Sequence, residues 1–306
     1  MMRGSLCLIV NPVAGGGRSL RALPAVTAEL TASGKSYQVA ESRSLEHATR
    51  LAAEAAAAGQ VVVAVGGDGM AGALAGAAAG AHGTFGIIPA GRGNDLARVL
   101  GIPADPAAAA RVLAAGHTRK ADLIGVRVPG RPEQAVAGSV YAGIPSVAGE
   151  LANRSHWLRG PVSYPAAALR ALAGWQPARF RLELAGDEGL DYAGYAVVIA
   201  NSAYFGAGMM VAPPARIDDG VLDIVTMRDG PKLAFLRVLL TIRGGTHVRL
   251  PQVGLSRAAS VTLTMDRDLP AAADGEALAG ASPLPAGTPL AIRALPGALT
   301  ALVPPA

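Results

Sequence analysis

Short apolar runs alternate with longer alanine- and leucine-rich segments over the first 120 residues of the chain. The runs have the length of strands, and several carry the β-branched residues that strands favour. They predict strands at Leu6–Val10, Tyr37–Ala40, Val61–Val65 and Gly86–Ile88. The segments between them predict helices at Leu20–Leu30, Leu45–Ala58 and Met70–Ala79. Such alternation is typical of a parallel sheet covered by helices on both faces, so we expect an N-terminal α/β domain.

After Asp122 the pattern changes to strand-like runs joined by turn residues. Leu123–Val128 and Ala135–Ala142 flank a Pro-Gly-Arg-Pro turn, and together they predict a hairpin. Further strands are expected at Arg179–Leu184, Leu190–Ala200, Val221–Met227, Val261–Met265 and Pro289–Ala294. We therefore expect a second, mainly antiparallel domain that begins near residues 120–124.

Glycine-rich turns follow three of the four N-terminal strands, at Asn11–Gly17, Gly66–Gly69 and Pro89–Gly93. Ligands of open parallel sheets bind beyond the carboxyl ends of the strands, so we expect these turns to meet at one edge. Glycines let backbone N–H groups approach an anion, and a helix N-terminus adds partial positive charge. The turns therefore predict a phosphate site, although each alone is compatible with an ordinary strand–helix connection.

Charged residues in these turns indicate which ligands the predicted phosphate site would bind. Asp68 suits a phosphate site mainly when Mg²⁺ joins the two groups, and otherwise it is an exposed turn carboxylate. Arg18 and Arg92 are cations with the geometry to bind phosphate, and Asn94 or Asp95 would cap the next helix. A Rossmann dinucleotide site is disfavoured, because the next predicted strand ends in Pro-Ala-Gly and lacks the acid that binds the ribose.

Composition limits the partners and the compartment. The chain is 51% hydrophobic, but no apolar stretch is long enough to span a membrane. One cysteine and five scattered histidines disfavour disulfides and a thiolate or histidine metal site, and they suit the cytoplasm. The net charge of +5 favours anionic partners such as nucleotides or acidic lipid surfaces. Without a Lys/Arg run interleaved with aromatic residues, we expect no nucleic-acid binding.

The segment Arg154–Pro177 combines Trp157, Tyr164 and Trp175 with three arginines. Such a pattern predicts either a helix packed on the sheet or contact with a membrane surface. Both interpretations stay open.

The motifs NPVAGGGRS, VGGDG, IPAGRGNDLAR and the late DGE occur in this order along the chain. Together they resemble the diacylglycerol kinase catalytic family, which includes bacterial lipid kinases and is related to sphingosine and ceramide kinases. Val197–Asp223 resembles the signature of the family's second domain. The resemblance implies a nucleotide-binding α/β domain like those of NAD kinase and phosphofructokinase (1–122, with a return at about 290–306). It also implies a C-terminal antiparallel β-sandwich domain (123–289), with ATP in the cleft between the two.

The resemblance also assigns roles to residues. Asp68 and Glu276 would be catalytic, with Glu276 as the general base, although it also fits the solvated flank of an Asp-Gly turn. Mg²⁺ would bind the Asp219 carboxylate and the carbonyls of Arg216 and Val221, with Asp122 in support; an ordinary Asp-Asp-Gly turn is the alternative. Nucleotide contacts are expected at Asn11, Pro12, Val13, Ala14, Gly15, Arg18, Ser42, Gly66, Gly67, Asp68, Gly69, Met70, Ala71, Gly72, Arg92, Asn94 and Asp95.

Several positions depart from the family pattern. Met70 and Arg92 stand where the family has threonine, Gly72 stands where it has asparagine, and Pro145 and Val147 replace its usual Gly and Asp. These changes fit weaker ATP binding, altered acceptor choice or an inactive relative. Losing a hydroxyl contact costs on the order of 1 kcal/mol, less than losing a charged group, so the retained acids favour activity.

We therefore expect a kinase that transfers the γ-phosphate of ATP, with Mg²⁺, to diacylglycerol or a related lipid. It would work as a peripheral enzyme at the inner face of the membrane, and homodimer formation stays open. The alternatives are an enzyme like NAD kinase and a non-catalytic regulator that binds nucleotide or lipid.

Overall fold

A parallel sheet forms the N-terminal part of the molecule. The computed structural model describes residues 4–12, 16–154, 163–186, 188–206, 208–280 and 282–305. Strands β4, β3, β1 and β2 lie in that order, and each adjacent pair is parallel. Their bounds are β1 Leu6–Val10, β2 Tyr37–Glu41, β3 Val61–Gly66 and β4 Thr84–Pro89. The predicted α/β arrangement is confirmed.

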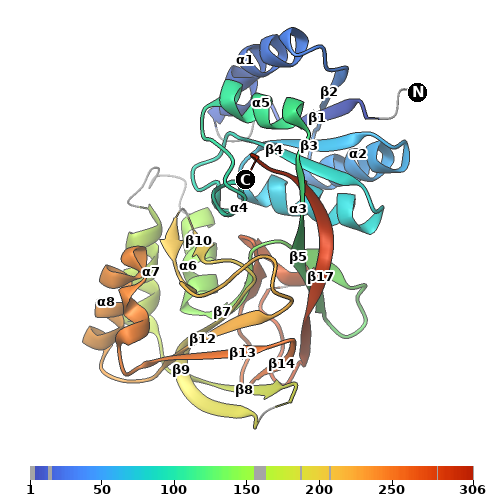
Figure 1. The fold of residues 1–306 in the computed structure, drawn as a ribbon. Coiled ribbons are helices and arrows are strands. Elements are labelled where there is room, and N and C mark those ends of the chain that lie inside the picture. The colour runs from blue at the N-terminus through green and yellow to red at the C-terminus, as the bar shows by residue number, and fades with distance from the viewer. Residues whose placement is uncertain are drawn as a thin grey trace.

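Helices cover both faces of this sheet. Figure 1 shows α1 and α5 on one side, and α2 and α3 on the other. Their bounds are α1 Arg18–Ala32, α2 Leu45–Ala57, α3 Asp68–Gly80, α4 Asp95–Val99 and α5 Pro106–Ala115. We did not predict α5, although its signals are local: Asp105 caps it through Ala108 N–H (2.8 Å), proline begins it and left-handed Gly116 ends it.

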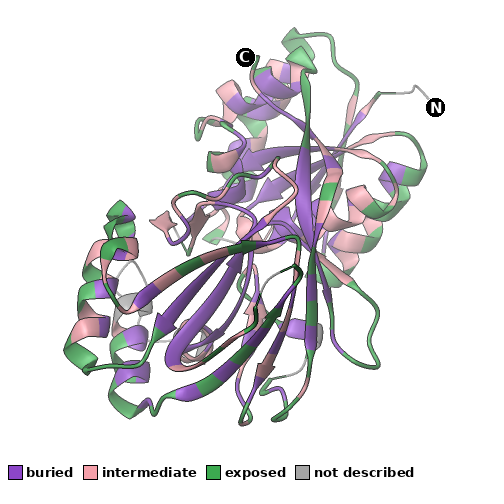
Figure 2. Ribbon diagram, turned by 60° about the horizontal axis from the view of Figure 1, so that its bottom comes forward, coloured by how far each residue is buried: buried purple, intermediate pink, exposed green. Residues whose placement is uncertain are grey.

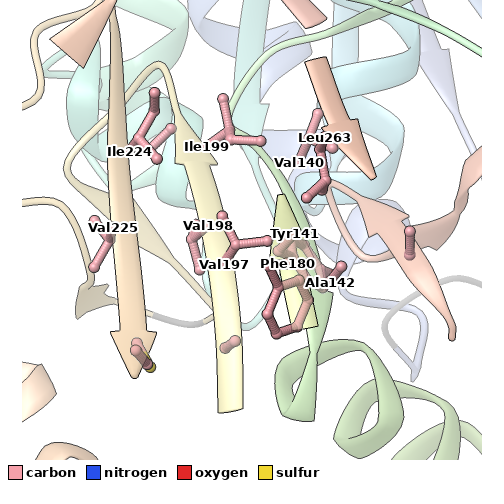
Figure 3. Packing of buried hydrophobic residues seen from close by; sticks show 14 of the residues in the cluster. Val140, Tyr141, Ala142, Phe180, Val197, Val198, Ile199, Ile224, Val225 and Leu263 are labelled. Carbon is pink, nitrogen blue, oxygen red and sulfur yellow. The ribbon is translucent and has the colours of Figure 1, made fainter. Parts of the chain in front are cut away.

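The C-terminal part is built from antiparallel strands. Strand β9 pairs with β12 along one side; on its other side it pairs first with β8 and then, beyond Tyr195, with β7. Val140, Ile199 and Ile224 consequently lie side by side on β7, β9 and β12 within the apolar core (Figure 3). The strands are β5 Thr118–Arg127, β6 Gln134–Val136, β7 Ser139–Gly143, β8 Ala178–Leu184, β9 Leu190–Ala200, β10 Tyr204–Phe205, β11 Met209–Met210, β12 Leu222–Arg228, β13 Val253–Ala258, β14 Ser260–Met265, β15 Ala271–Ala273, β16 Glu276–Ala277 and β17 Leu290–Leu302.

The predicted hairpin of Leu123–Val128 with Ala135–Ala142 is only partly right. Strand β5 does pair with β6, but the chain leaves that ladder before β7, which pairs with β9 and β15 instead. The cause is Asp274, whose carboxylate accepts the N–H groups of Ala137 (2.8 Å), Gly138 (2.9 Å) and Ser139 (2.9 Å). These groups are therefore withdrawn from strand pairing.

The last strand connects the two parts of the molecule. Strand β17 is 13 residues long, and its end runs parallel to β4, with Thr300 opposite Thr84. It is antiparallel to β5 and, at its start, to β14 (Figure 1). The last strand is therefore part of both the parallel sheet and the antiparallel strands.

Three helices lie on the outside of the antiparallel strands: α6 Ile144–Arg154, α7 Ser163–Gly174 and α8 Lys232–Thr241. Figure 2 shows the strands beneath them largely buried. Trp175, just after α7, is buried, and its Nε1 donates to Gly194 O (3.2 Å). Of the segment Arg154–Pro177, this part packs on the sheet, whereas Trp157 lies outside the described residues and nothing is described of the Tyr164 side chain. Among the described helices, none has the length and apolarity that a membrane crossing requires.

Candidate functional site

The second and third glycine-rich turns meet at the carboxyl edge of the parallel sheet. Gly67 and Gly91 approach so closely that a Cβ on Gly91 would overlap Gly67 Cα. Arg18, at the start of α1, donates from Nη1 to Gly91 O (2.9 Å) and joins the first turn to them. Val13, Ala14 and Gly15 lie outside the described residues. The expected convergence is therefore present among the described parts of the turns, and only glycine permits the close approach of 67 and 91.

Asp68 organises the third turn from the first turn of α3. Its Oδ2 accepts the N–H of Asn94 (2.8 Å), and its Oδ1 accepts the N–H of Asp95 (2.5 Å). Asn94 is the N-cap residue of α4, as expected, but its side chain makes no capping hydrogen bond, because Asp68 accepts these N–H groups instead. Asn94 Oδ1 instead accepts the N–H of Gly91 (2.8 Å), and Asp95 Oδ1 accepts that of Gly208 (2.8 Å).

Asp274 lies opposite these turns, and we had assigned it no role. Besides accepting three N–H groups, it turns the chain between β15 and β16 with a left-handed backbone (φ 46). Burial raises the pKa of Asp274; the three N–H groups oppose this rise, and the charge of Asp68 adds to it. The Asp-Gly turn was visible in the sequence, but its three distant N–H donors were not.

Glu276 follows on β16 with an exposed side chain. Its Oε1 lies over the start of α3, where a Cβ on Gly69 would be 3.6 Å from it. The proposed base is thus next to the Gly-Gly-Asp-Gly turn, although the two are more than 200 residues apart in sequence.

A cleft of about 210 Å³ lies between Asp68 and Asp274. Three carboxylates line it, Asp68 and Asp95 from one side and Asp274 from the other, together with Ser202 and Tyr204. Such a lining repels a polyphosphate unless cations accompany it.

The predicted metal loop lies away from this lining. Arg257 donates to Asp219 Oδ2, and its Nε is 3.3 Å from Asp223 Oδ1. Asp223 and Arg257 are directly opposite each other on β12 and β13, so the sheet register places the Arg257 guanidinium beside the carboxylate of Asp223. Asp122 binds the loop through the N–H of Gly220 (2.6 Å). Arg257 was not among our candidates, because its partners are more than 30 residues away.

The remaining candidates have varied surroundings. Ser42 is buried, and its hydroxyl donates to Val10 O (3.2 Å) at the end of β1. Asn11 and Pro12 follow β1 and are partly exposed, whereas Arg92 is exposed within the third turn. Arg216 forms an ion pair with Asp218 (3.5 Å). Met70 is buried beneath Gly66, where a Cβ would come within 2.9 Å of its Sδ.

Gly72, where the resemblance leads us to expect asparagine, faces Asp274. A Cβ there would lie 2.7 Å from Asp274 Oδ2. We expect Gly72→Ala to lower the free energy of unfolding by about 1–2 kcal/mol, because the carboxylate must leave its N–H donors. Gly80→Ala, in open space at the end of the same helix, should raise it by about 0.5 kcal/mol. Urea unfolding measures both variants, and equal effects would contradict the contact.

Comparisons with known proteins show the family of the chain. The family model of the diacylglycerol kinase catalytic domain matches residues 5–126, and that of the YegS C-terminal NAD kinase beta sandwich-like domain matches residues 138–303. A diacylglycerol kinase of Mycobacterium tuberculosis H37Rv is 33% identical over 303 residues, covering 98% of this chain and 96% of that protein.

The chain belongs to the diacylglycerol kinase family.

Another relative, a diacylglycerol kinase of Staphylococcus saprophyticus, is 25% identical over 281 residues and covers 90% of both proteins. The crystal structure of a diacylglycerol kinase from Bacillus anthracis Sterne has the same fold, with a TM-score of 0.75 at 21% identity, over 98% of this chain and 97% of that one. The predicted C-terminal β-sandwich domain is thereby confirmed. Kinases of this family act on lipids and use ATP. The departures at Met70, Gly72 and Arg92 therefore occur within a diacylglycerol kinase-family chain.

Proposed function

We propose that the chain transfers the γ-phosphate of ATP to a hydroxyl of diacylglycerol or a closely related lipid. The observation that carries this proposal is the position of Glu276 over the Gly-Gly-Asp-Gly turn. A kinase of this type needs in-line positioning, cations near the phosphates and one group that takes the proton of the acceptor. Glu276 is exposed beside the turn that would hold the phosphates, so it meets the last requirement.

In the proposed reaction, Glu276 takes the proton of the lipid hydroxyl while that oxygen forms a bond to the γ-phosphorus. The bond from the γ-phosphorus to the bridging oxygen breaks, and ADP leaves with the electron pair. Asp68 holds the third turn through two N–H groups, and Arg18 ties the first turn to it. These residues act by fixing the backbone that would surround the nucleotide. In this assignment residues 1–122 and the return strand bind nucleotide, and residues 123–289 supply the base.

Mg²⁺ is proposed as the cation of the reaction. The acid-lined cleft fits this proposal, because Mg²⁺ prefers carboxylate oxygens, and both Asp68 oxygens keep a further lone pair. When bound, Mg²⁺ would supply positive charge that neutralises the phosphates. The loop of Arg216, Asp219 and Val221 also offers hard oxygen ligands, but there Arg257 already contacts Asp219.

The loop gives a testable prediction about Mg²⁺. If the loop binds Mg²⁺, Asp219→Ala should lower the melting temperature and reduce its increase with Mg²⁺, because a ligand of the folded state stabilises by mass action. Arg257→Gln should enlarge that increase, because it removes a competing cation. Differential scanning calorimetry with and without Mg²⁺ measures both. If Asp219→Ala responded to Mg²⁺ as fully as the parent, the loop would be an ordinary turn.

An assay with γ-labelled ATP tests the function directly. The parent is expected to label a diacylglycerol in a mixed lipid extract dispersed in detergent, and to leave NAD unlabelled. Labelling of NAD without any lipid would favour the alternative like NAD kinase, which shares the Gly-Gly-Asp-Gly turn. Nucleotide or lipid binding without transfer to either acceptor would favour the regulator.

A further inference from the structure

Helices α7 and α8 carry exposed leucines on neighbouring outer faces. The helices lie side by side, and Lys232 Nζ, at the start of α8, donates to Ala173 O on α7 (2.5 Å; Figure 1). Leu233 and Leu240 on α8 are 63% and 75% exposed, and Leu169 on α7 is 48% exposed. Exposed leucines scattered singly need no explanation, but three on two neighbouring outer helices call for one.

The patch does not serve the core. On α8, Phe235 and Val238 are the residues that turn inward and are buried. Leu233, Arg237 and Leu240 are spaced by four and three residues, so they share the opposite face of the helix. We call Leu169, Arg170, Leu233, Arg237 and Leu240 the α7–α8 face.

The two segments that carry this face are without acidic residues. No Asp or Glu occurs in the sequence between Asp229 and Asp266, a stretch that includes Lys232 and Arg237. None occurs between Glu150 and Glu183, a stretch that includes Arg170. Both helices therefore present leucine and arginine without a neighbouring acid on their own segments, the combination found on helices that lie in an anionic lipid interface.

The inner side of the same helices leads towards the cleft. An apolar slot beneath them is lined by Ala168 of α7 and by Phe235, Val238 and Leu239 of α8. Phe205 lines both this slot and the cleft that contains Asp68. A surface that binds the α7–α8 face would therefore be separated from the glycine-rich turns by the apolar residues that line this slot.

We propose that the α7–α8 face docks on an anionic lipid bilayer. The inference rests on the proposed function, because a lipid kinase must reach an acceptor that stays in the membrane: exposing each buried CH₂ costs about 0.8 kcal/mol. A second copy of the chain fits the face less well. A two-fold interface brings the same patch against itself, so Arg170 and Arg237 would face like charges without an acid to pair with.

Vesicle flotation with the full chain tests the docking surface. Leu233→Gln combined with Leu240→Gln should weaken binding to phosphatidylglycerol-containing vesicles about tenfold, because it removes the apolar contact. Arg237→Gln should weaken binding mainly at low salt, because surface charge is screened over about 8 Å at physiological ionic strength. Val39→Gln and Arg50→Gln, at exposed positions of the parallel-sheet part, are the matched controls and should bind as the parent does.

Activity separates this inference from the proposed function. The double leucine variant should phosphorylate diacylglycerol in detergent micelles at the parental rate and lose activity only on vesicles. Vesicle binding equal to that of the parent would overturn the docking surface. A parental dimer that the double variant dissociates, with vesicle binding unchanged, would assign the face to self-association instead. If the parent labels no lipid in micelles, the proposed function fails, while the flotation result still decides the docking surface.

Discussion

Glu276→Gln is expected to lower the turnover number by about 10²–10⁴ while the dissociation constant for ATP changes little. The substitution keeps the shape of the side chain but removes the oxygen that would take the proton. A group that acts in the transition state affects turnover more than ground-state binding. Because Glu276 is exposed at the end of a hairpin, its loss should leave the fold intact. Single-turnover phosphorylation and ATP titration measure the two quantities separately.

The matched control is Glu183→Gln. Glu183 is also exposed on a strand of the same part of the molecule, where it pairs with Arg181 (3.3 Å). The Glu183→Gln variant should therefore keep the full activity of the parent. Near-parental turnover of Glu276→Gln would remove Glu276 from the mechanism and leave it as the solvated flank of a turn.

Asp274→Ala is expected to have the largest effect on stability, lowering the free energy of unfolding by about 3 kcal/mol. The substitution leaves the N–H groups of Ala137, Gly138 and Ser139 without their acceptor at a part-buried site. It also releases the turn that positions Glu276 two residues later, so turnover should fall in the protein that remains folded. Urea unfolding and kinetics at low temperature measure the two effects.

Two further substitutions control this experiment. Asp266→Ala removes a carboxylate that accepts one N–H, that of Arg179 (3.0 Å), at an exposed site, so it should cost about 1 kcal/mol or less. Asp274→Asn keeps one acceptor oxygen and should fall between the parent and the alanine variant. An unfolding free energy of Asp274→Ala within about 0.5 kcal/mol of the parent would show that solvent replaces the carboxylate.

Local patterns predicted the frame of the site. The strand runs and their glycine-rich turns are neighbours in sequence, so periodicity and turn chemistry placed Gly67, Asp68 and Gly91 at one edge of the sheet. The same patterns did not give the partners of Asp68, because the choice between capping by the Asn94 side chain and capping by the distant Asp68 depends on the tertiary fold. The contacts of Asp274 and Arg257 were not predicted for the same reason, because each side chain binds residues more than 30 positions away in the sequence.

Local signals also mislead where tertiary contacts compete with them. Ala135–Ala142 has the composition of one continuous strand, yet Asp274 interrupts it by binding three of its N–H groups. Trp175 and its arginine-rich surroundings fitted a membrane contact as well as a core helix, and the burial of Trp175 decides for the core at that residue. The exposed leucines of α8 gave no signal, because helical periodicity alone does not say which face the remaining molecule covers.

Strand β17 also has a consequence for synthesis on the ribosome. It is the neighbour of β4 within the sheet, but it begins at Leu290, about 200 residues after β4 ends at Pro89. While the chain is being translated, the outer edge of β4 has no partner, and open edges invite association between nascent chains. Pairing over such a sequence separation also slows folding. The sheet that starts at residue 6 is therefore completed only when nearly all of the chain has left the ribosome.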